Sequence, residues 1–172
     1  MRTVAVVDHD PEWVRLFEQE ARSIERALGS CLVRVHHIGS TAVPGLAAKP
    51  VIDILIEVVG LESLERRYGP VLELGYCARG ENGLPGRRYF TKGGERRTHQ
   101  LHGFQVDDEQ VGRHLAFRDY LRQHPAVRDE YAAVKHATIL ACGGSSSTYA
   151  ALKEPFIQRH QAKALAAWRA TP

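Results

Sequence analysis

The apolar run at residues 51–59 constrains the fold of this chain more than any other segment. It reads V-I-D-I-L-I-E-V-V and is rich in β-branched side chains. A nearly continuous apolar run of this kind is typical of a central strand that is buried on both faces of a sheet. Asp53 interrupts the run, and a buried carboxylate is costly unless it is paired or bound to a cation. The run therefore predicts a central strand that carries a functional aspartate.

The remaining hydrophobic patterns predict a mixed arrangement of helices and strands that ends in helices alone. Helices are expected at residues 12–28, 61–74, 109–122, 125–140 and from the Gly- and Ser-rich break at 143–147 to about 168, and strands at 31–37, 51–59, 76–79, 87–91 and 98–106. Pro155 lies inside the last helix, so that helix should kink there or begin later. We expect an α+β fold, a mixed β-sheet flanked by helices with a helical C-terminal third.

Composition indicates an ordinary globular chain and excludes several classes of protein. Hydrophobic residues make up 44% and charged residues 25% of the chain, and the formal net charge of +3 is too small to indicate a nucleic-acid-binding protein. The three cysteines, Cys31, Cys77 and Cys142, are far apart, which argues against a disulfide framework or a structural zinc site. We expect one cytoplasmic domain over residues 1–172, with an α/β core at 1–108, a helical part at 109–172 and no membrane association.

A loop at residues 39–50 has the properties of a phosphate-binding loop. Gly39 and Ser40 follow a strand, so the glycine allows close backbone approach while N–H groups and the hydroxyls of Ser40 and Thr41 bind phosphate oxygens. Asp53 would repel those phosphates unless a cation lay between them, which suggests Mg²⁺ or Mn²⁺ at Asp53. The alternative is a simple turn, with Asp53 capping local backbone.

Several ordered motifs resemble those of the GrpB family, whose members resemble nucleotidyltransferases of the DNA polymerase β type. The segment H-I-G-S-T-A-V-P-G-L-A-A-K-P-V-I-D-I at 37–54 is very similar to the family signature. R-T-H-Q-L-H at 97–102 and F-R-D-Y-L-R-Q-H-P at 117–125 resemble two further family motifs. Tyr131, Lys135, Tyr149, Lys153 and Phe156 match its C-terminal Tyr-x-x-x-Lys and Tyr-x-x-x-Lys-x-x-Phe patterns. The chain is identified as a member of this family, which implies a nucleotidyltransferase-like fold.

The expected carboxylate set of such an enzyme is incomplete. Nucleotidyltransferases of this fold usually carry Asp-x-Asp or Asp-x-Glu and a third acid on a neighbouring strand, whereas this chain has Leu55 at the second position. Glu57 lies about 7 Å further along the same strand face, too far to replace it. The strand at 98–106 offers Gln100 and His102 instead of an acid. A two-metal site is therefore not expected, whereas the residues allow a single cation at Asp53, with His102 and ligand phosphates as its further ligands.

The roles of the other candidate residues remain open in the sequence. His102 is either an acid or base, a phosphate ligand, or a structural histidine. Lys49 and Arg97 are expected to point into the site and neutralise phosphate. The resemblance implies that Lys135, Tyr149 and Lys153 close the ligand cleft, although Tyr and Lys four residues apart on a helix usually indicate packing. Arg118 and Arg122 share a helix face, from which Asp119 is expected to turn away.

Two functions of different classes follow from these features. The first is a transferase that binds a nucleotide or another phosphorylated small molecule at Gly39, Ser40 and Asp53 and transfers a nucleotidyl or phosphoryl group with one cation. The second is a non-catalytic module that binds a nucleotide or a coenzyme A-type phosphoester; fusions of GrpB-like domains to dephospho-CoA kinase favour such ligands. RNA binding is a weaker alternative, because basic and aromatic residues alternate only at 87–90.

Overall fold

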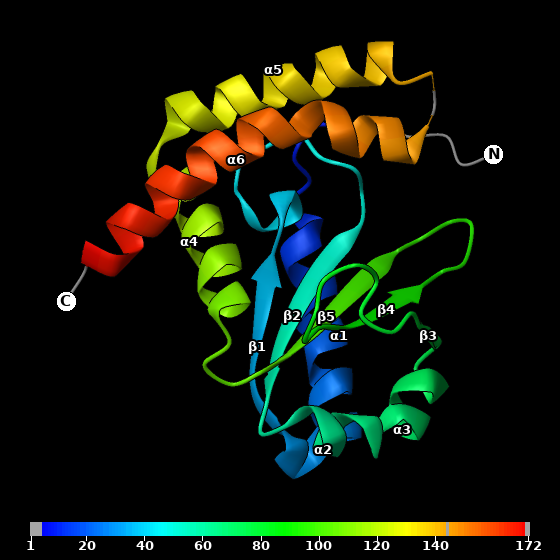
Figure 1. Cartoon of the computed structure of the whole chain (residues 1–172). Coiled ribbons are helices and arrows are strands. Elements are labelled where there is room, and N and C mark those ends of the chain that lie inside the picture. Colours follow the sequence, from blue (N-terminus) through cyan, green and yellow to red (C-terminus); the bar gives the residue numbers. More distant parts are fainter. Residues whose placement is uncertain (1–4, 144, 171–172) are drawn as a thin grey trace.

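A five-stranded mixed sheet in the order β1-β2-β5-β4-β3 forms the centre of the computed structural model, which describes residues 5–143 and 145–170 (Figure 1). The central strand β2 pairs antiparallel with β1 and parallel with β5. The strands are β1 (Leu32–Ile38), β2 (Ile52–Val58), β3 (Tyr76–Ala78), β4 (Arg88–Lys92) and β5 (His99–Gln105). All of the expected strands are present, and the predicted α+β class with a mixed sheet is confirmed.

Helices pack beside the sheet and across one of its ends (Figure 1). They are α1 (Glu12–Leu28), α2 (Leu61–Glu65), α3 (Tyr68–Glu73), α4 (Glu109–Gln123), α5 (Pro125–Ala141) and α6 (Ser146–Ala170), with short 3₁₀ turns η1 (Gly29–Cys31) and η2 (Ser40–Ala42). Figure 1 shows α5 and α6 side by side across one end of the sheet, above the loop that joins β1 to β2. None of the helices in the described ranges is long and apolar enough to cross a membrane.

One helix prediction was wrong in detail, and one of the two alternatives for the last helix is excluded. Residues 61–74 form two short helices instead of one, because Pro70 in the first turn of α3 has no N–H to continue the hydrogen bonds of α2. The last helix does not begin after Pro155: α6 starts at Ser146 and includes that proline. The other helix ends lie within about two residues of expectation, the usual uncertainty of a helix boundary.

The alternating side chains of β2 belong to two separate apolar clusters. Ile52, Ile54 and Ile56 pack in the core on the α1 side of the sheet, together with Ile24 of α1. Leu55 packs on the opposite face in a second cluster, whose other buried members are Ile38, Phe104, Val111 and Leu115. The strand is therefore buried on both faces, as its composition predicts. Asp53 lies on the same face as Leu55, one step nearer the β1–β2 loop.

A third apolar cluster joins the loop to the C-terminal helices. Val43 and Leu46 of the loop are fully buried against Leu121 of α4, Tyr131 of α5 and Phe156 of α6. The rings of Tyr131 and Phe156 stack with centroids 4.8 Å apart. The helical third of the chain therefore holds the β1–β2 loop in place over the end of the sheet.

Candidate functional site

Gly39 turns the chain at the end of β1 and lies directly against Asp53. Its φ angle of +71° is one that glycine adopts readily, and a Cβ atom there would lie 2.7 Å from Asp53 Oδ2. Ile38, the preceding residue, pairs with Asp53 across the β1–β2 ladder. Ser40 then begins the 3₁₀ turn η2. The strand register thus places the Gly-Ser turn and the aspartate side by side.

A cavity of about 690 Å³ opens between this turn, the end of the sheet and the C-terminal helices. Most of the predicted ligand-binding residues line it: Ser40, Thr41, Lys49, Asp53, Arg97, Gln100, Lys135, Tyr149 and Lys153. Gly39 and His102 are not among the lining residues, and both contact Asp53 from outside the cavity. Glu95 and Arg96 also line the cavity, and the sequence did not single them out for the site. They lie in an irregular loop after Gly93 and Gly94, whose course no periodic pattern reveals.

Lys135 of α5 is the most deeply buried cation of the site, with 1% of its surface exposed. Its Nζ donates hydrogen bonds to Ser40 Oγ and, at 2.9 Å, to the carbonyl oxygen of Ala47. It also lies 4.4 Å from the ring centroid of Tyr131. Burial lowers the pKa of Lys135 well below its ordinary value, and the neighbouring charge of Lys153 lowers it further. Lys135 therefore joins α5 directly to the Gly-Ser turn.

Two more lysines meet at one tyrosine ring. The ammonium of Lys49 lies 4.0 Å and that of Lys153 lies 4.2 Å from the ring centroid of Tyr149. Burial, followed by repulsion from Lys49, lowers the pKa of Lys153 to about 8. Burial also raises the pKa of Tyr149 to about 12. Arg97 is a further cation on the cavity wall, and its buried Nε has no hydrogen-bond partner among the described residues. An anionic ligand would relieve this concentration of positive charge.

Asp53 is the carboxylate at the centre of the cavity, and its surroundings fit at most one cation. His102 Nε2 lies 3.4 Å from Asp53 Oδ1, while His102 Nδ1 is buried without a hydrogen-bond partner among the described residues. Residues 5–143 and 145–170 contain no group of three or more His, Cys, Asp or Glu side chains placed to hold a metal ion. Glu57 pairs instead with His36, 2.7 Å away, and with Arg34. A divalent ion at Asp53 would need phosphate oxygens and water as its other ligands.

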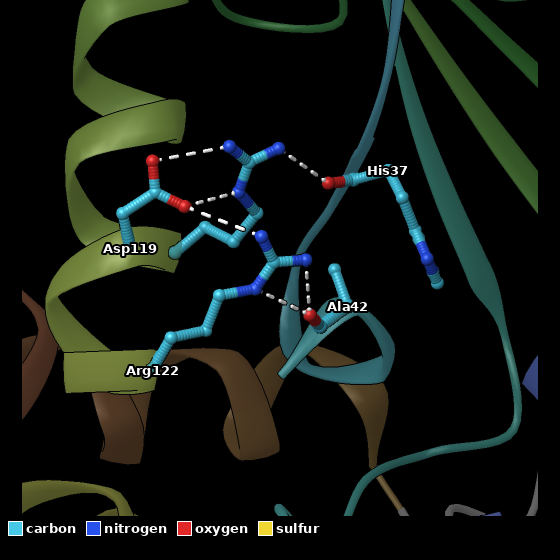
Figure 2. Close-up of polar contacts among 5 residues, drawn as sticks. His37, Ala42, Asp119 and Arg122 are labelled. Carbon is cyan, nitrogen blue, oxygen red and sulfur yellow. Dashed lines mark hydrogen bonds and ion pairs between the residues drawn. The ribbon is translucent and has the colours of Figure 1, made fainter. Parts of the chain in front are cut away.

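Two arginines of α4 donate hydrogen bonds to backbone carbonyls, one near the end of β1 and one in the β1–β2 loop (Figure 2). Arg118 donates to the carbonyl oxygen of His37 at 3.1 Å, and Arg122 donates twice to that of Ala42, at 2.9 and 2.7 Å. Asp119 accepts hydrogen bonds from both guanidinium groups. The expectation that Asp119 turns away from these arginines was wrong, because the long arginine side chains fold back along the helix to reach it. This motif orders the loop and does not line the cavity.

Three comparisons with known proteins agree on the family of this chain. The family model described as GrpB protein matches residues 3–163. YqkA of Bacillus subtilis is 39% identical over 91% of this chain, which corresponds to 46% of YqkA. A dephospho-CoA kinase of Mycolicibacterium paratuberculosis is 30% identical over 90% of this chain, which corresponds to 44% of the kinase. The chain thus spans less than half the length of these two relatives.

Solved structures extend the likeness to three dimensions. The crystal structure of GrpB from Enterococcus faecalis is 41% identical, has a TM-score of 0.91, and covers 95% of this chain and 99% of that one. The poly(U) polymerase Cid1, solved with its short product ApU, has a TM-score of 0.53 at 11% sequence identity. The match covers 76% of this chain and 42% of the Cid1 chain. At that identity the likeness concerns the fold alone, and it confirms the nucleotidyltransferase-like architecture. The chain belongs to the GrpB family.

Proposed function

We propose that this protein binds a nucleotide or another phosphorylated small molecule in the cavity between the Gly-Ser turn and the C-terminal helices. The observation that carries the proposal is the charge of the cavity. Lys49, Lys153 and Arg97 line the cavity together with Asp53, and burial already lowers the pKa of Lys153. A phosphate group restores the balance of charge, and Ser40 and Thr41 add hydroxyl donors at the same wall.

The first form of this function is phosphoryl or nucleotidyl transfer with one cation. Mg²⁺ or Mn²⁺ would sit between the Asp53 carboxylate and the ligand phosphates, and the lysines would take the place of a second ion in stabilising charge on phosphate oxygens. His102 would orient Asp53 through the contact between Nε2 and Oδ1. The nucleotidyltransferase-like fold supports this form.

The second form is binding without chemistry. It is favoured by the position of Leu55, which is fully buried in the core where related enzymes carry a second acid. The relatives that bear the name dephospho-CoA kinase make a coenzyme A-type phosphoester a reasonable ligand to test in either form. Gln100, Arg97 and Tyr149, which also line the cavity, would then contact the part of the ligand beyond the phosphates.

Calorimetric titration separates the two forms, because they predict opposite effects of Asp53→Asn on ligand affinity when a cation is present. ATP, ADP, coenzyme A and pyrophosphate are titrated into the wild-type protein and into Asp53→Asn, with Mg²⁺, with Mn²⁺ and with EDTA. In the transferase form, Asp53→Asn weakens binding by roughly tenfold or more when the cation is present, because a ligand of the ion is lost. The same substitution strengthens binding in EDTA, because a negative charge beside the phosphates is removed.

The non-catalytic form predicts a different pattern from the same titration. Asp53→Asn then strengthens binding with or without the cation, and Lys49→Met weakens it under both conditions. Asp129→Asn is the matched control, because Asp129 is an exposed carboxylate on α5 paired with Arg128 and does not line the cavity. If no nucleotide, coenzyme or pyrophosphate binds under any condition, the proposed function is wrong in both forms.

A further inference from the structure

The contact between Lys135 and Ser40 resembles the pairing of a base with a nucleophile. Lys135 Nζ is held against Ser40 Oγ by a second hydrogen bond to the carbonyl of Ala47, at 2.9 Å, and by the ring of Tyr131. Simple attraction of a phosphate needs an ammonium that is free to reach it. Lys135 is instead fixed in place, with its amine directed at one hydroxyl and 1% of its surface exposed.

Lys135 Nζ contacts two oxygen atoms, the Ser40 hydroxyl and the Ala47 carbonyl, and donates a hydrogen bond to each. When this amine is neutral, its one lone pair is directed at Ser40 Oγ and is able to accept the hydroxyl proton, while an N–H group still donates to Ala47. Burial lowers the pKa of Lys135, and Lys153 of α6 and Lys49 of the loop act in the same direction. Asp53 of β2 opposes them. A neutral amine in contact with a hydroxyl is able to remove its proton, as the activation of a serine requires.

Ser40 lies at a position from which its hydroxyl group can reach a ligand in the cavity. Gly39, at φ +71°, turns the chain where β1 ends. Ser40 follows it as the first residue of η2 and lines the cavity. Lys153 and Arg97 line the same cavity, and the buried Nε of Arg97 has no partner among the described residues. These groups are available to stabilise negative charge that develops on an electrophile attacked by Ser40.

We propose that Ser40 is a nucleophile toward phosphorus electrophiles and that Lys135 is its general base. The identity of the natural electrophile rests on the proposed function: it is the terminal phosphoryl group of a bound nucleoside triphosphate. Ser40 Oγ forms a bond to that phosphorus, and the bond from phosphorus to the bridging oxygen breaks. The leaving nucleoside diphosphate takes the electron pair, and the Ser40 proton moves to Lys135 Nζ. The product is phosphoserine at position 40 with Lys135 as an ammonium.

A fluorophosphonate tests the nucleophile without any assumption about the ligand. In this reagent Ser40 Oγ displaces fluoride from phosphorus, so labelling requires only an activated serine. We expect labelling of the wild-type protein at Ser40, located by peptide mass spectrometry, and no labelling at that peptide in Ser40→Ala. Ser30→Ala is the matched control, because Ser30 is an exposed serine in η1 outside the cavity. Labelling of Ser40 at or below the rate of Ser30 in the wild-type protein overturns the proposal.

The role of Lys135 is tested by substitution and by rescue. Lys135→Met should slow labelling of Ser40 by roughly 100-fold or more, the usual contribution of a general base, while Lys163→Met, at an exposed position of α6, leaves the rate unchanged. In Lys135→Ala, added ethylamine should restore part of the rate by entering the space left by the side chain. Recovery of the labelling rate by ethylamine also distinguishes a base from a structural lysine when a variant loses stability, because an added amine can replace a base. Undiminished labelling in Lys135→Met, or no rescue in Lys135→Ala, overturns this assignment.

The labelling result is distinguishable from failure of the proposed function. If Ser40 reacts with the fluorophosphonate and no phosphorylated ligand binds in the titrations, the nucleophile stands and the proposed ligand class is wrong. If ATP binds, intact mass spectrometry should show the added mass of one phosphoryl group on the wild-type protein and none on Ser40→Ala. Binding of ATP without labelling of Ser40 by either reagent leaves the proposed function in place and overturns the nucleophile.

Discussion

The two walls of the cavity contrast sharply in charge and in packing. On the sheet wall, Asp53 is the carboxylate that lines the cavity, and the next position on its strand face, Leu55, is buried in apolar core. On the opposite wall, the β1–β2 loop and the C-terminal helices contribute the lysines Lys49, Lys135 and Lys153, whereas Arg96 and Arg97 come from the loop before β5. Among the described residues, the sheet wall thus presents a single carboxylate, and the helical wall presents the lysines.

Under the proposed function, this difference assigns the binding of phosphate mainly to the helical wall. Two-metal transfer depends on carboxylates that neighbouring strands present together, and this sheet does not assemble them. In the proposed function, buried lysines supply part of the same neutralisation without a metal ion, and Lys153 comes from one of the helices that pack against the loop. Binding should therefore depend more on α5 and α6 than on the sheet, which the following changes test from the largest expected effect to the smallest.

The largest effect is expected from an attempt to complete the sheet wall with Leu55→Asp. Leu55 is fully buried against Phe104, Val111 and Leu115, so the substitution removes apolar packing and introduces a buried charge. We expect a loss of about 4 kcal/mol or more in the free energy of unfolding, measured by urea denaturation. Val59→Asp, at an exposed position just after β2, should cost far less. A stable Leu55→Asp protein that binds two Mn²⁺ ions would contradict the contrast between the walls.

Gly39→Ala should have the next largest effect, because this residue joins the two walls. The new Cβ would lie 2.7 Å from Asp53 Oδ2 at a φ angle of +71°, so both strain and a clash follow. We expect a loss of about 3 kcal/mol in unfolding free energy. Gly60→Ala is the matched control, since a Cβ there meets nothing within 4 Å and φ is extended. Equal stability of the two variants would show that Asp53 moves aside freely.

Sequence patterns predicted the sheet wall more accurately than the helical wall. The apolar run around Asp53 located β2, because a strand buried on both faces must be apolar on both. The contact between Lys135 and Ser40 joins positions 95 residues apart, and no local pattern reveals it. The family resemblance alone pointed to Lys135. Periodicity likewise misplaced Asp119, because it fixes where a Cβ points and not where a long neighbouring arginine ends.

Periodicity also failed where the backbone does not repeat. Glu95 and Arg96 reach the cavity from a loop shaped by Gly93 and Gly94, both at positive φ, and such a course depends on tertiary contacts. In contrast, Pro70 was visible in the sequence, and its missing N–H explains the split between α2 and α3.

Arg122→Ala should loosen the helical wall with a moderate effect. The substitution removes both hydrogen bonds to the Ala42 carbonyl and one contact with Asp119. We expect a loss of about 1–2 kcal/mol in unfolding free energy and faster amide hydrogen exchange confined to the β1–β2 loop. Arg122→Lys should recover little of this, because one ammonium cannot reproduce the paired donors. Faster exchange spread evenly over the sheet would argue against a specific clamp on the loop.

The smallest effect is a dependence of ligand affinity on pH that only the helical wall predicts. Burial and Lys49 lower the pKa of Lys153 to about 8, so its ammonium is present below that pH and is lost as pH rises through it. Affinity for pyrophosphate should then fall by roughly tenfold between pH 7 and pH 9.5, equivalent to about 1.4 kcal/mol. His37 and His114, whose pKa values burial lowers to about 4, do not titrate in this range.

Lys153→Arg provides the decisive comparison for this last effect. A guanidinium stays charged across the whole range, so the contribution of position 153 to the pH dependence should disappear while affinity at pH 7 changes little. Any slope that remains in Lys153→Arg then comes from the other titrating groups, including pyrophosphate itself. If affinity instead rises from pH 7 to pH 9.5 in both proteins, phosphate binding does not depend on these ammonium groups. The sheet wall, with a cation at Asp53, would then have to hold the ligand.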